Sequence, residues 1–148
     1  MNQAQPASEI AVGSLPIRQK STVARERATI MLVEDEAFVR EITGEILEAA
    51  GYRVLKTRNA VEALDTFRRC KHNVQLLLTD VVLPGRNGRD LASDLRNVSP
   101  SLRTIFISGY PENAVTQSGV PKDGIFYLPK PFSTQSLTRI VKKVLQPA

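Results

Sequence analysis

Short apolar runs alternate along the chain with amphipathic stretches of helical length. Runs of strand length cover residues 29–34, 52–57, 74–79, 103–107 and 125–128. Helical spacing follows at 36–50, 60–71, 87–98 and 134–146, with a weak helix, broken by glycine and proline, at 111–118. Short apolar runs indicate strands, and apolar residues at i, i+3 and i+4 indicate helices. The pattern therefore predicts five repeats of strand then helix.

Residue types suited to helix ends mark several of these boundaries. Gly51 suits a left-handed end for the first helix. Asn59 and Glu62 resemble a capping pair for the second, and Ser133 suits the N-cap of the last. The last helix has one apolar stripe at Leu137, Ile140, Val141, Val144 and Leu145. We expect this stripe to pack on a flat surface.

Continuous apolar strands separated by helices are typical of a mostly parallel sheet covered on both faces. Ligands of such sheets bind beyond the carboxyl ends of the strands. Four polar groups each follow a different predicted strand: Glu34-Asp35, Asp80, Ser108 and Lys130. We expect them to meet at one edge of the sheet, although they are far apart in the sequence.

The length and composition fit one globular domain. The chain has 148 residues, of which 42% are hydrophobic and 24% charged, enough for a core that folds alone. Residues 1–28 are rich in Gln, Ser, Ala and Pro and are predicted to be a disordered arm or linker, leaving 29–148 as the folded domain. No apolar stretch has the length of a membrane span or the form of a signal peptide, which predicts a cytoplasmic protein without a membrane partner.

The net charge of +5 raises the question of nucleic-acid binding. Residues 1–28 contain four basic and two acidic residues and so account for +2 of this charge. The remainder has no dense basic run with interleaved aromatic residues. This distribution favours a solvated basic surface and predicts no direct nucleic-acid partner. The single cysteine, Cys70, cannot form an internal disulfide and is interpreted as structural or incidental.

The acidic residues at the predicted edge suit a hard divalent cation. Mg²⁺ takes oxygen ligands, commonly one or two carboxylates with several waters. Asp35 and Asp80 can bind it directly, and Glu34 can reach it through a water. Glu36 is placed to begin the first helix, where a negative side chain suits the helix dipole. Taken alone, the three acids at 34–36 could equally form a solvated cluster at a helix start.

Lys130 and Ser108 suit the binding of a phosphoryl group at the same edge. Lys130 stands between two prolines, which stiffen the backbone, although a lysine in an exposed loop has the same appearance. Beside Asp80 its ammonium could hold the carboxylate or a phosphoryl oxygen. Ser108 with Gly109 could donate hydrogen bonds to phosphate, but such a pair alone indicates only a turn. Together these groups predict an aspartate that accepts a phosphoryl group.

From about Thr29 to Gln146 the chain resembles the receiver domain of two-component response regulators. The resemblance rests on four motifs in order: Leu32–Glu36, Leu78–Gly85 with Asn87-Gly88, Ile107–Tyr110 and Tyr127–Phe132. It implies an α/β, flavodoxin-like (βα)5 fold, a doubly wound parallel sheet with strand order 2-1-3-4-5. The stretches 106–111 and 128–133 are most similar to receivers attached to hybrid sensor histidine kinases.

The resemblance also implies which residues react and which bind metal. Asp80 would accept a phosphoryl group from a phosphohistidine of a sensor histidine kinase or histidine phosphotransfer protein. Mg²⁺, or Mn²⁺ in its place, would be coordinated by Asp35, Asp80 and the backbone carbonyl of Val82, with Glu34 acting through a water. The conformational change that follows would control a downstream protein target.

Further roles follow from the same resemblance. Lys130 would contact the phosphoryl group and Ser108 would donate a hydrogen bond to it. Tyr127 occupies the position of the family's switch aromatic, whose rotamer follows the movement of Ser108. The Lys130-Pro131 bond is expected to be cis, which X-Pro bonds permit at low cost. Glu34 and Ser108 replace the commoner aspartate and threonine.

Other function classes fit less well. A phosphatase or mutase of the haloacid dehalogenase class would need a second acid two residues after the nucleophile, where Val82 stands. A flavin-binding protein would need a phosphate loop rich in Ser, Thr and Gly after the first strand. A phosphorylation-independent interaction module of the same fold stays as the alternative. We expect no dedicated enzyme, only a domain that promotes its own aspartyl phosphorylation and dephosphorylation, with a donor other than the single histidine, His72.

Overall fold

The computed structural model describes residues 27–70, 73–109 and 124–146. The predicted weak helix at 111–118, His72, and all but two residues of the predicted arm lie outside the described residues. Within them the predicted strands and helices are all present, with ends that differ from the predicted ones by at most two residues.

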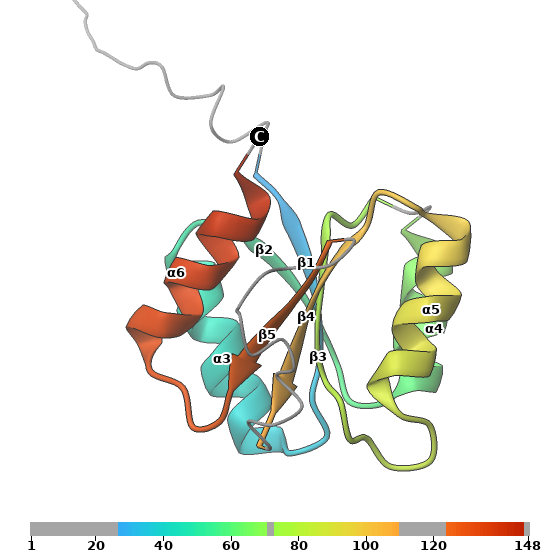
Figure 1. The fold of residues 1–148 in the computed structure, drawn as a ribbon, viewed down its shortest axis with the longest axis horizontal. Coiled ribbons are helices and arrows are strands. Elements are labelled where there is room, and N and C mark those ends of the chain that lie inside the picture. Colours follow the sequence, from blue (N-terminus) through green and yellow to red (C-terminus); the bar gives the residue numbers. More distant parts are fainter. Residues whose placement is uncertain (1–26, 71–72, 110–123, 147–148) are drawn as a thin grey trace, which may run out of the picture.

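The described elements alternate between strand and helix over most of the chain (Figure 1). In chain order they are β1 (Thr29–Val33), α3 (Ala37–Ala49), β2 (Arg53–Thr57), α4 (Ala60–Arg69), β3 (Leu76–Asp80), α5 (Gly88–Val98), β4 (Arg103–Ser108), β5 (Ile125–Pro129) and α6 (Thr134–Leu145).

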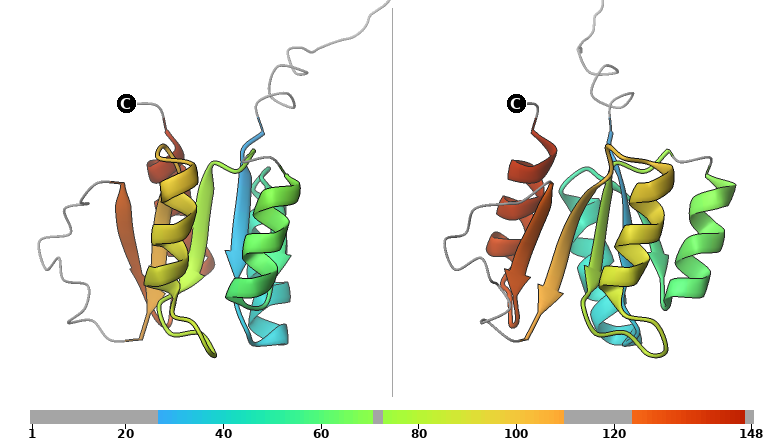
Figure 2. Two further views of the ribbon diagram at one scale, coloured as in Figure 1. Left: turned by 90° about the vertical axis from the view of Figure 1, so that its right-hand side faces the viewer. Right: turned by 45° about the vertical axis from the view of Figure 1, so that its right-hand side comes forward.

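The five strands form one parallel sheet in the order β2-β1-β3-β4-β5, and their arrows point the same way in Figure 2. The predicted fold class and strand order are therefore confirmed. Asp80 lies opposite Ile107, and Ser108 lies opposite Pro129. This register brings the ends of β3, β4 and β5 to one edge, which is the edge where the sequence predicted a site.

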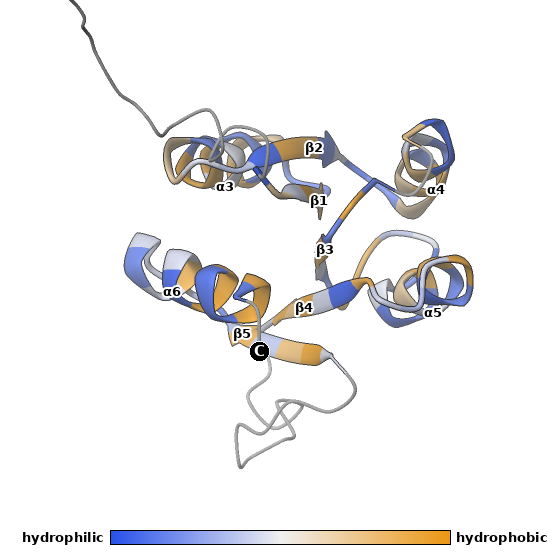
Figure 3. Cartoon of the chain, turned by 90° about the horizontal axis from the view of Figure 1, so that it is seen from above, coloured by the Kyte–Doolittle hydropathy of each residue, from blue (hydrophilic) through white to orange (hydrophobic). Residues whose placement is uncertain are grey.

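The helices cover both faces of the sheet. Viewed from above in Figure 3, α3 and α6 lie on one side and α4 and α5 on the other. Alternate residues of each central strand enter different cores: Met31 and Leu77 pack with α4 and α5, whereas Leu32 and Leu78 pack with α6. A strand buried on both faces needs apolar residues at every position, which explains the continuous apolar runs.

The predicted helix ends are largely as expected. Gly51 has a positive φ of 103°. The Asn59 side chain accepts a hydrogen bond from the Glu62 N–H at 2.8 Å, and Ser133 caps α6 by accepting one from the Ser136 N–H at 3.0 Å. Glu62 differs from the predicted reciprocal pair, because its side chain accepts from the Arg58 N–H at 2.9 Å. The α6 stripe faces the sheet as predicted.

Candidate functional site

Three carboxyl groups meet at the carboxyl ends of β1 and β3. Glu34 follows β1 and is 2% exposed, Asp80 ends β3 and is 4% exposed, and Asp35 is exposed. One oxygen from each of the three groups lies within 4.8 Å of the others. Glu36 is the N-cap residue of α3, as expected of a residue that begins this helix, but its side chain makes no capping hydrogen bond.

Lys130 and Ser108 complete the cluster from the neighbouring strands. The Nζ atom of Lys130 lies 3.0 Å from Oδ1 of Asp80, and Ser108, 7% exposed, ends β4. With Val82 they line an open depression of about 370 Å³. The structure thus brings together the residues that the sequence placed at this edge, and the Lys130-Pro131 bond is cis as expected.

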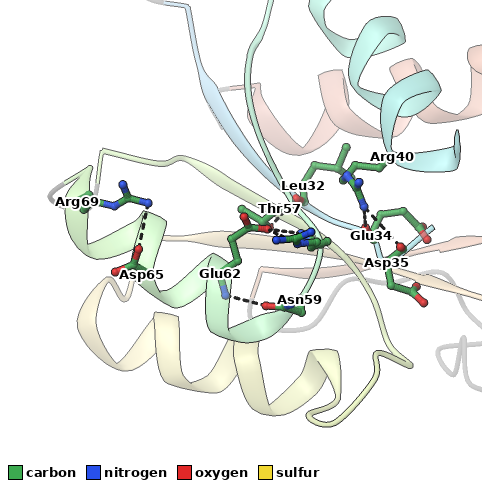
Figure 4. A network of polar contacts seen from close by, with 10 residues as sticks. Leu32, Glu34, Asp35, Arg40, Thr57, Asn59, Glu62, Asp65 and Arg69 are labelled. Carbon is green, nitrogen blue, oxygen red and sulfur yellow. Dashed lines mark hydrogen bonds and ion pairs between the residues drawn. The ribbon is translucent and has the colours of Figure 1, made fainter. Parts of the chain in front are cut away.

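The turn after β1 is held by contacts that sequence reasoning missed. The Nη1 atom of Arg40, on α3, donates to the Glu34 carbonyl at 2.8 Å (Figure 4). The Glu36 N–H donates to Oε2 of Glu34 at 3.1 Å, and the Glu34 N–H donates to the Thr57 carbonyl at 3.0 Å. The Glu34 carboxylate therefore has a fixed position. The position of Arg40 in the first turns of the predicted helix was the available sequence signal.

Gly88, the first residue of α5, packs directly on the backbone of Asp80. Its N–H donates to the Val81 carbonyl at 2.7 Å. A Cβ at this position would lie 2.0 Å from the Asp80 carbonyl oxygen, which no side chain can tolerate without a shift. The start of α5 and the end of β3 can be this close only because residue 88 is glycine. The sequence motif contained Gly88 but gave no reason for it.

The site carries excess negative charge. Burial, and next the carboxyl group of Asp80, raise the pKa of Glu34 from 4.5 to about 7, while the Glu36 N–H opposes this rise. Burial would lower the pKa of Lys130, but the carboxylate of Asp80 outweighs it, so that this pKa lies above its usual value. One ammonium faces three carboxyl groups, and the site therefore favours an additional cation.

The donor set fits a hard divalent ion. Its members are carboxylate oxygens, which Mg²⁺ and Mn²⁺ accept readily. Oδ1 of Asp80 is buried and pairs with the Lys130 ammonium at 3.0 Å, and among the described residues this ammonium is the cation placed against the cluster of three carboxyl groups. Buried carboxylates are costly unless cations compensate them, and Lys130 supplies a single positive charge for the cluster.

Tyr127, on β5, lies next to the site and is partly buried. It stands opposite Phe106 in the sheet, with ring centroids 5.7 Å apart and an interplanar angle of 36°. Its hydroxyl accepts a hydrogen bond from Nη1 of Arg89, on α5, at 3.0 Å. No sequence signal indicated this contact of Arg89.

A parallel sheet of this order is a doubly wound, flavodoxin-like fold, and the carboxylates and the lysine lie at its carboxyl edge, where sheets of this kind bind ligands. The family model of the response regulator receiver domain matches residues 30–142, and the chain belongs to this family of two-component signalling.

None of the helices in the described part of the chain is both long and apolar enough to cross a membrane.

Relatives include both parts of longer proteins and a short receiver protein. The chain is 38% identical over 129 residues to the sensor kinase CckA of Brucella abortus (strain 2308), a match that covers 86% of this chain and 14% of CckA. It is 33% identical over 117 residues to the response regulator receiver protein CpdR of the same strain, covering 78% of this chain and 95% of CpdR. The chain therefore spans only a small part of CckA but almost all of CpdR.

Solved structures show the same fold. The receiver domain of the hybrid histidine kinase CckA is 34% identical with a TM-score of 0.70, and the match covers 80% of this chain and 100% of that domain. A receiver domain protein from Clostridium thermocellum is 26% identical, again with a TM-score of 0.70, over 80% of this chain and 94% of that one. The similarity to a hybrid-kinase receiver agrees with the resemblance seen in the sequence.

Proposed function

We propose that Asp80 accepts a phosphoryl group from a histidine kinase or a histidine phosphotransfer protein, and that the phosphorylated chain changes conformation to control a partner protein. The observation that carries this proposal is the buried Asp80 carboxylate, 3.0 Å from Lys130 and clustered with two further carboxyl groups, on the wall of an open depression. Membership of the receiver family supports it.

The transfer replaces one bond to phosphorus by another. A carboxylate oxygen of Asp80 attacks the phosphorus, the bond from phosphorus to the donor imidazole nitrogen breaks, and the imidazole leaves with the electron pair of that bond. Lys130 offsets the negative charge of the phosphoryl oxygens, and the Ser108 hydroxyl donates a hydrogen bond to one of them. Catalysis here consists of positioning and charge neutralisation, so the chain promotes its own modification without being a dedicated enzyme.

A divalent ion would be held by Asp35, Asp80 and the backbone carbonyl of Val82, with Glu34 acting through a water. When bound, Mg²⁺ or Mn²⁺ would neutralise charge shared by the carboxylates and the phosphoryl oxygens. The excess negative charge of the site and the raised pKa of Glu34 support this assignment.

Ser108 and Tyr127 are proposed as the residues that convey the phosphorylated state to the surface. Alternate residues of a strand share one face, so Ser108 projects to the same side of β4 as Phe106, which contacts the Tyr127 ring. A movement of Ser108 toward the phosphoryl group would open space beside this pair. The rotamer of Tyr127 would then change.

Intact-mass spectrometry with acetyl phosphate and MgCl₂ tests the proposal. The wild type is expected to gain the mass of one phosphoryl group, and chelation of the metal should suppress the gain. Asp80→Asn should gain nothing, whereas the control Asp65→Asn, on the exposed face of α4, should react like the wild type. An unmodified wild type, or an Asp80→Asn protein modified to the same extent, contradicts the proposal and favours the phosphorylation-independent module.

A further inference from the structure

Three contacts converge on the guanidinium group of Arg89. Its Cζ atom lies 5.3 Å from the centroid of the Phe106 ring and 5.7 Å from that of Tyr127. Its Nη1 atom also donates to the Tyr127 hydroxyl at 3.0 Å. Both rings are within the range of cation–π attraction. One exposed side chain therefore restrains the position of Tyr127 through its ring and its hydroxyl together.

The backbone next to Arg89 is held against the end of β3, the strand that ends at Asp80. Its neighbour Gly88 donates a hydrogen bond to the Val81 carbonyl at 2.7 Å and leaves no space for a Cβ next to Asp80. The first turn of α5 is thus held against the end of β3, while the Arg89 side chain reaches across to β4 and β5. The Arg89 guanidinium therefore restrains Tyr127, and the position of Arg89 depends in turn on the packing of Gly88 against the backbone of Asp80.

We propose that Arg89 is a positioning residue that holds Tyr127 in the orientation described here, opposes its rotation, and so sets the affinity of the site for a phosphoryl group. The proposal rests on the proposed function, in which a ligand at Asp80 moves Tyr127. A rotation of the Tyr127 side chain breaks the hydrogen bond and the ring contact with Arg89. The ligand must supply the free energy of these contacts, which lowers its apparent affinity.

Beryllofluoride with Mg²⁺, a mimic of the phosphoryl group, provides the test. The chain contains three tyrosines, so protein labelled with 3-fluorotyrosine should give three fluorine NMR signals, and Tyr127→Phe identifies the relevant one. In the wild type the Tyr127 signal should move as beryllofluoride saturates the site. In Arg89→Gln the half-saturating concentration should fall about fivefold, the size expected for an exposed cation–π contact with a hydrogen bond.

The phosphate-free Tyr127 signal of Arg89→Gln should also shift toward its saturated position, which a merely structural role would not produce. Arg89→Lys keeps the charge and should fall between the two proteins. Arg69→Gln removes an arginine that pairs with Asp65 on the surface of α4 and should match the wild type. Equal midpoints of urea unfolding will show that the variants are folded.

A double-mutant cycle links the effect to the tyrosine hydroxyl. Tyr127→Phe keeps the ring but removes the acceptor of the Arg89 hydrogen bond, so Arg89→Gln should lower the half-saturating concentration less in this background. Because the Tyr127 signal is lost in this background, half-saturation is read in all four proteins from the fluorine NMR signal of the bound beryllofluoride. An effect of the same size in both backgrounds contradicts the hydroxyl link and overturns the proposal.

Three further results overturn the proposal and differ in what they say of the function. If Arg89→Gln has the wild-type half-saturating concentration and Tyr127 signal, or if Tyr127 does not move in saturated wild type, the inference about Arg89 is wrong while the acceptor role of Asp80 stands. If the wild type binds no beryllofluoride, the proposed function fails and the inference fails with it.

Discussion

Replacement of Gly88 by alanine tests how closely the start of α5 must approach the acceptor. The new Cβ would lie 2.0 Å from the Asp80 carbonyl oxygen, 3.1 Å from the carbonyl carbon and 3.3 Å from Cγ2 of Thr79. Carbon and oxygen atoms in close contact are ordinarily about 3.3 Å apart. The obstructing oxygen belongs to the backbone and cannot rotate away. Either α5 or the end of β3 must therefore move by roughly 1 Å.

This shift should affect both stability and phosphorylation. Overpacking of this kind costs about 1–3 kcal/mol of the free energy of unfolding. A misplacement of about 1 Å at a reacting group can lower a rate by roughly 100-fold. Urea unfolding followed by circular dichroism measures the first effect, and the initial rate of phosphorylation by acetyl phosphate measures the second. Saturating Mg²⁺ in the rate assay separates a displaced carboxylate from weakened metal binding.

Gly44→Ala is the matched control. Gly44 lies within α3, and the nearest atom to an added Cβ is Cδ of Lys56, at 2.8 Å, in a flexible side chain that can move aside. Alanine in a helix interior is favoured over glycine by up to about 1 kcal/mol, so this variant should be close to wild type or slightly more stable and should react normally. A Gly88→Ala protein with the stability and rate of Gly44→Ala would refute the reasoning.

Three other substitutions probe separate features. The raised pKa of Glu34 means that its contribution to stability is fully present below pH 4.5 and is lost as the pH rises through about 7. Without Mg²⁺, the free energy of unfolding should therefore fall by about 3 kcal/mol over this pH range. Urea unfolding of Glu34→Gln should lack this part of the pH dependence. Lys130→Ala should still bind Mg²⁺ in calorimetric titrations but show a smaller spectral change with beryllofluoride, because the partner of Asp80 is gone. Asn59→Ala removes the cap of α4 and should cost about 1 kcal/mol in urea unfolding without changing phosphorylation.

Each of these expectations has a clear contrary result. The same pH dependence in Glu34→Gln and wild type would show that Glu34 does not titrate in this range. A Lys130→Ala protein with a wild-type response to beryllofluoride would separate Lys130 from the conformational change. A slower phosphorylation of Asn59→Ala would show that the α4 cap influences the site.

The fold was predictable because each central strand is buried on both faces. The runs that became β1 and β3 contain the uninterrupted apolar stretches Ile30–Val33 and Leu76–Leu78, and every residue of both strands is buried. The approximate site was predictable for a related reason, since the carboxyl ends of parallel strands share one edge. This rule predicted that Asp80 and Lys130 lie close together, although they are far apart in the sequence.

The contacts within the site were not predictable from the pattern. Glu34 and Asp35 are adjacent acids, but only the backbone path after β1 decides that Glu34 is buried and Asp35 exposed. The contact of Gly88 with Asp80 depends on the docking angle of α5. The Arg89 contact with Tyr127 depends on rotamers, which periodicity does not determine.

The location of the phosphoryl group tests the central claim most directly. After reaction with acetyl phosphate and Mg²⁺, borohydride reduces an aspartyl phosphate to homoserine, and peptide mass spectrometry identifies the modified position. We predict homoserine at position 80, absent when acetyl phosphate is omitted. Homoserine at another aspartate, or at none in a sample that gained phosphoryl mass, would contradict the assignment of Asp80 as the acceptor.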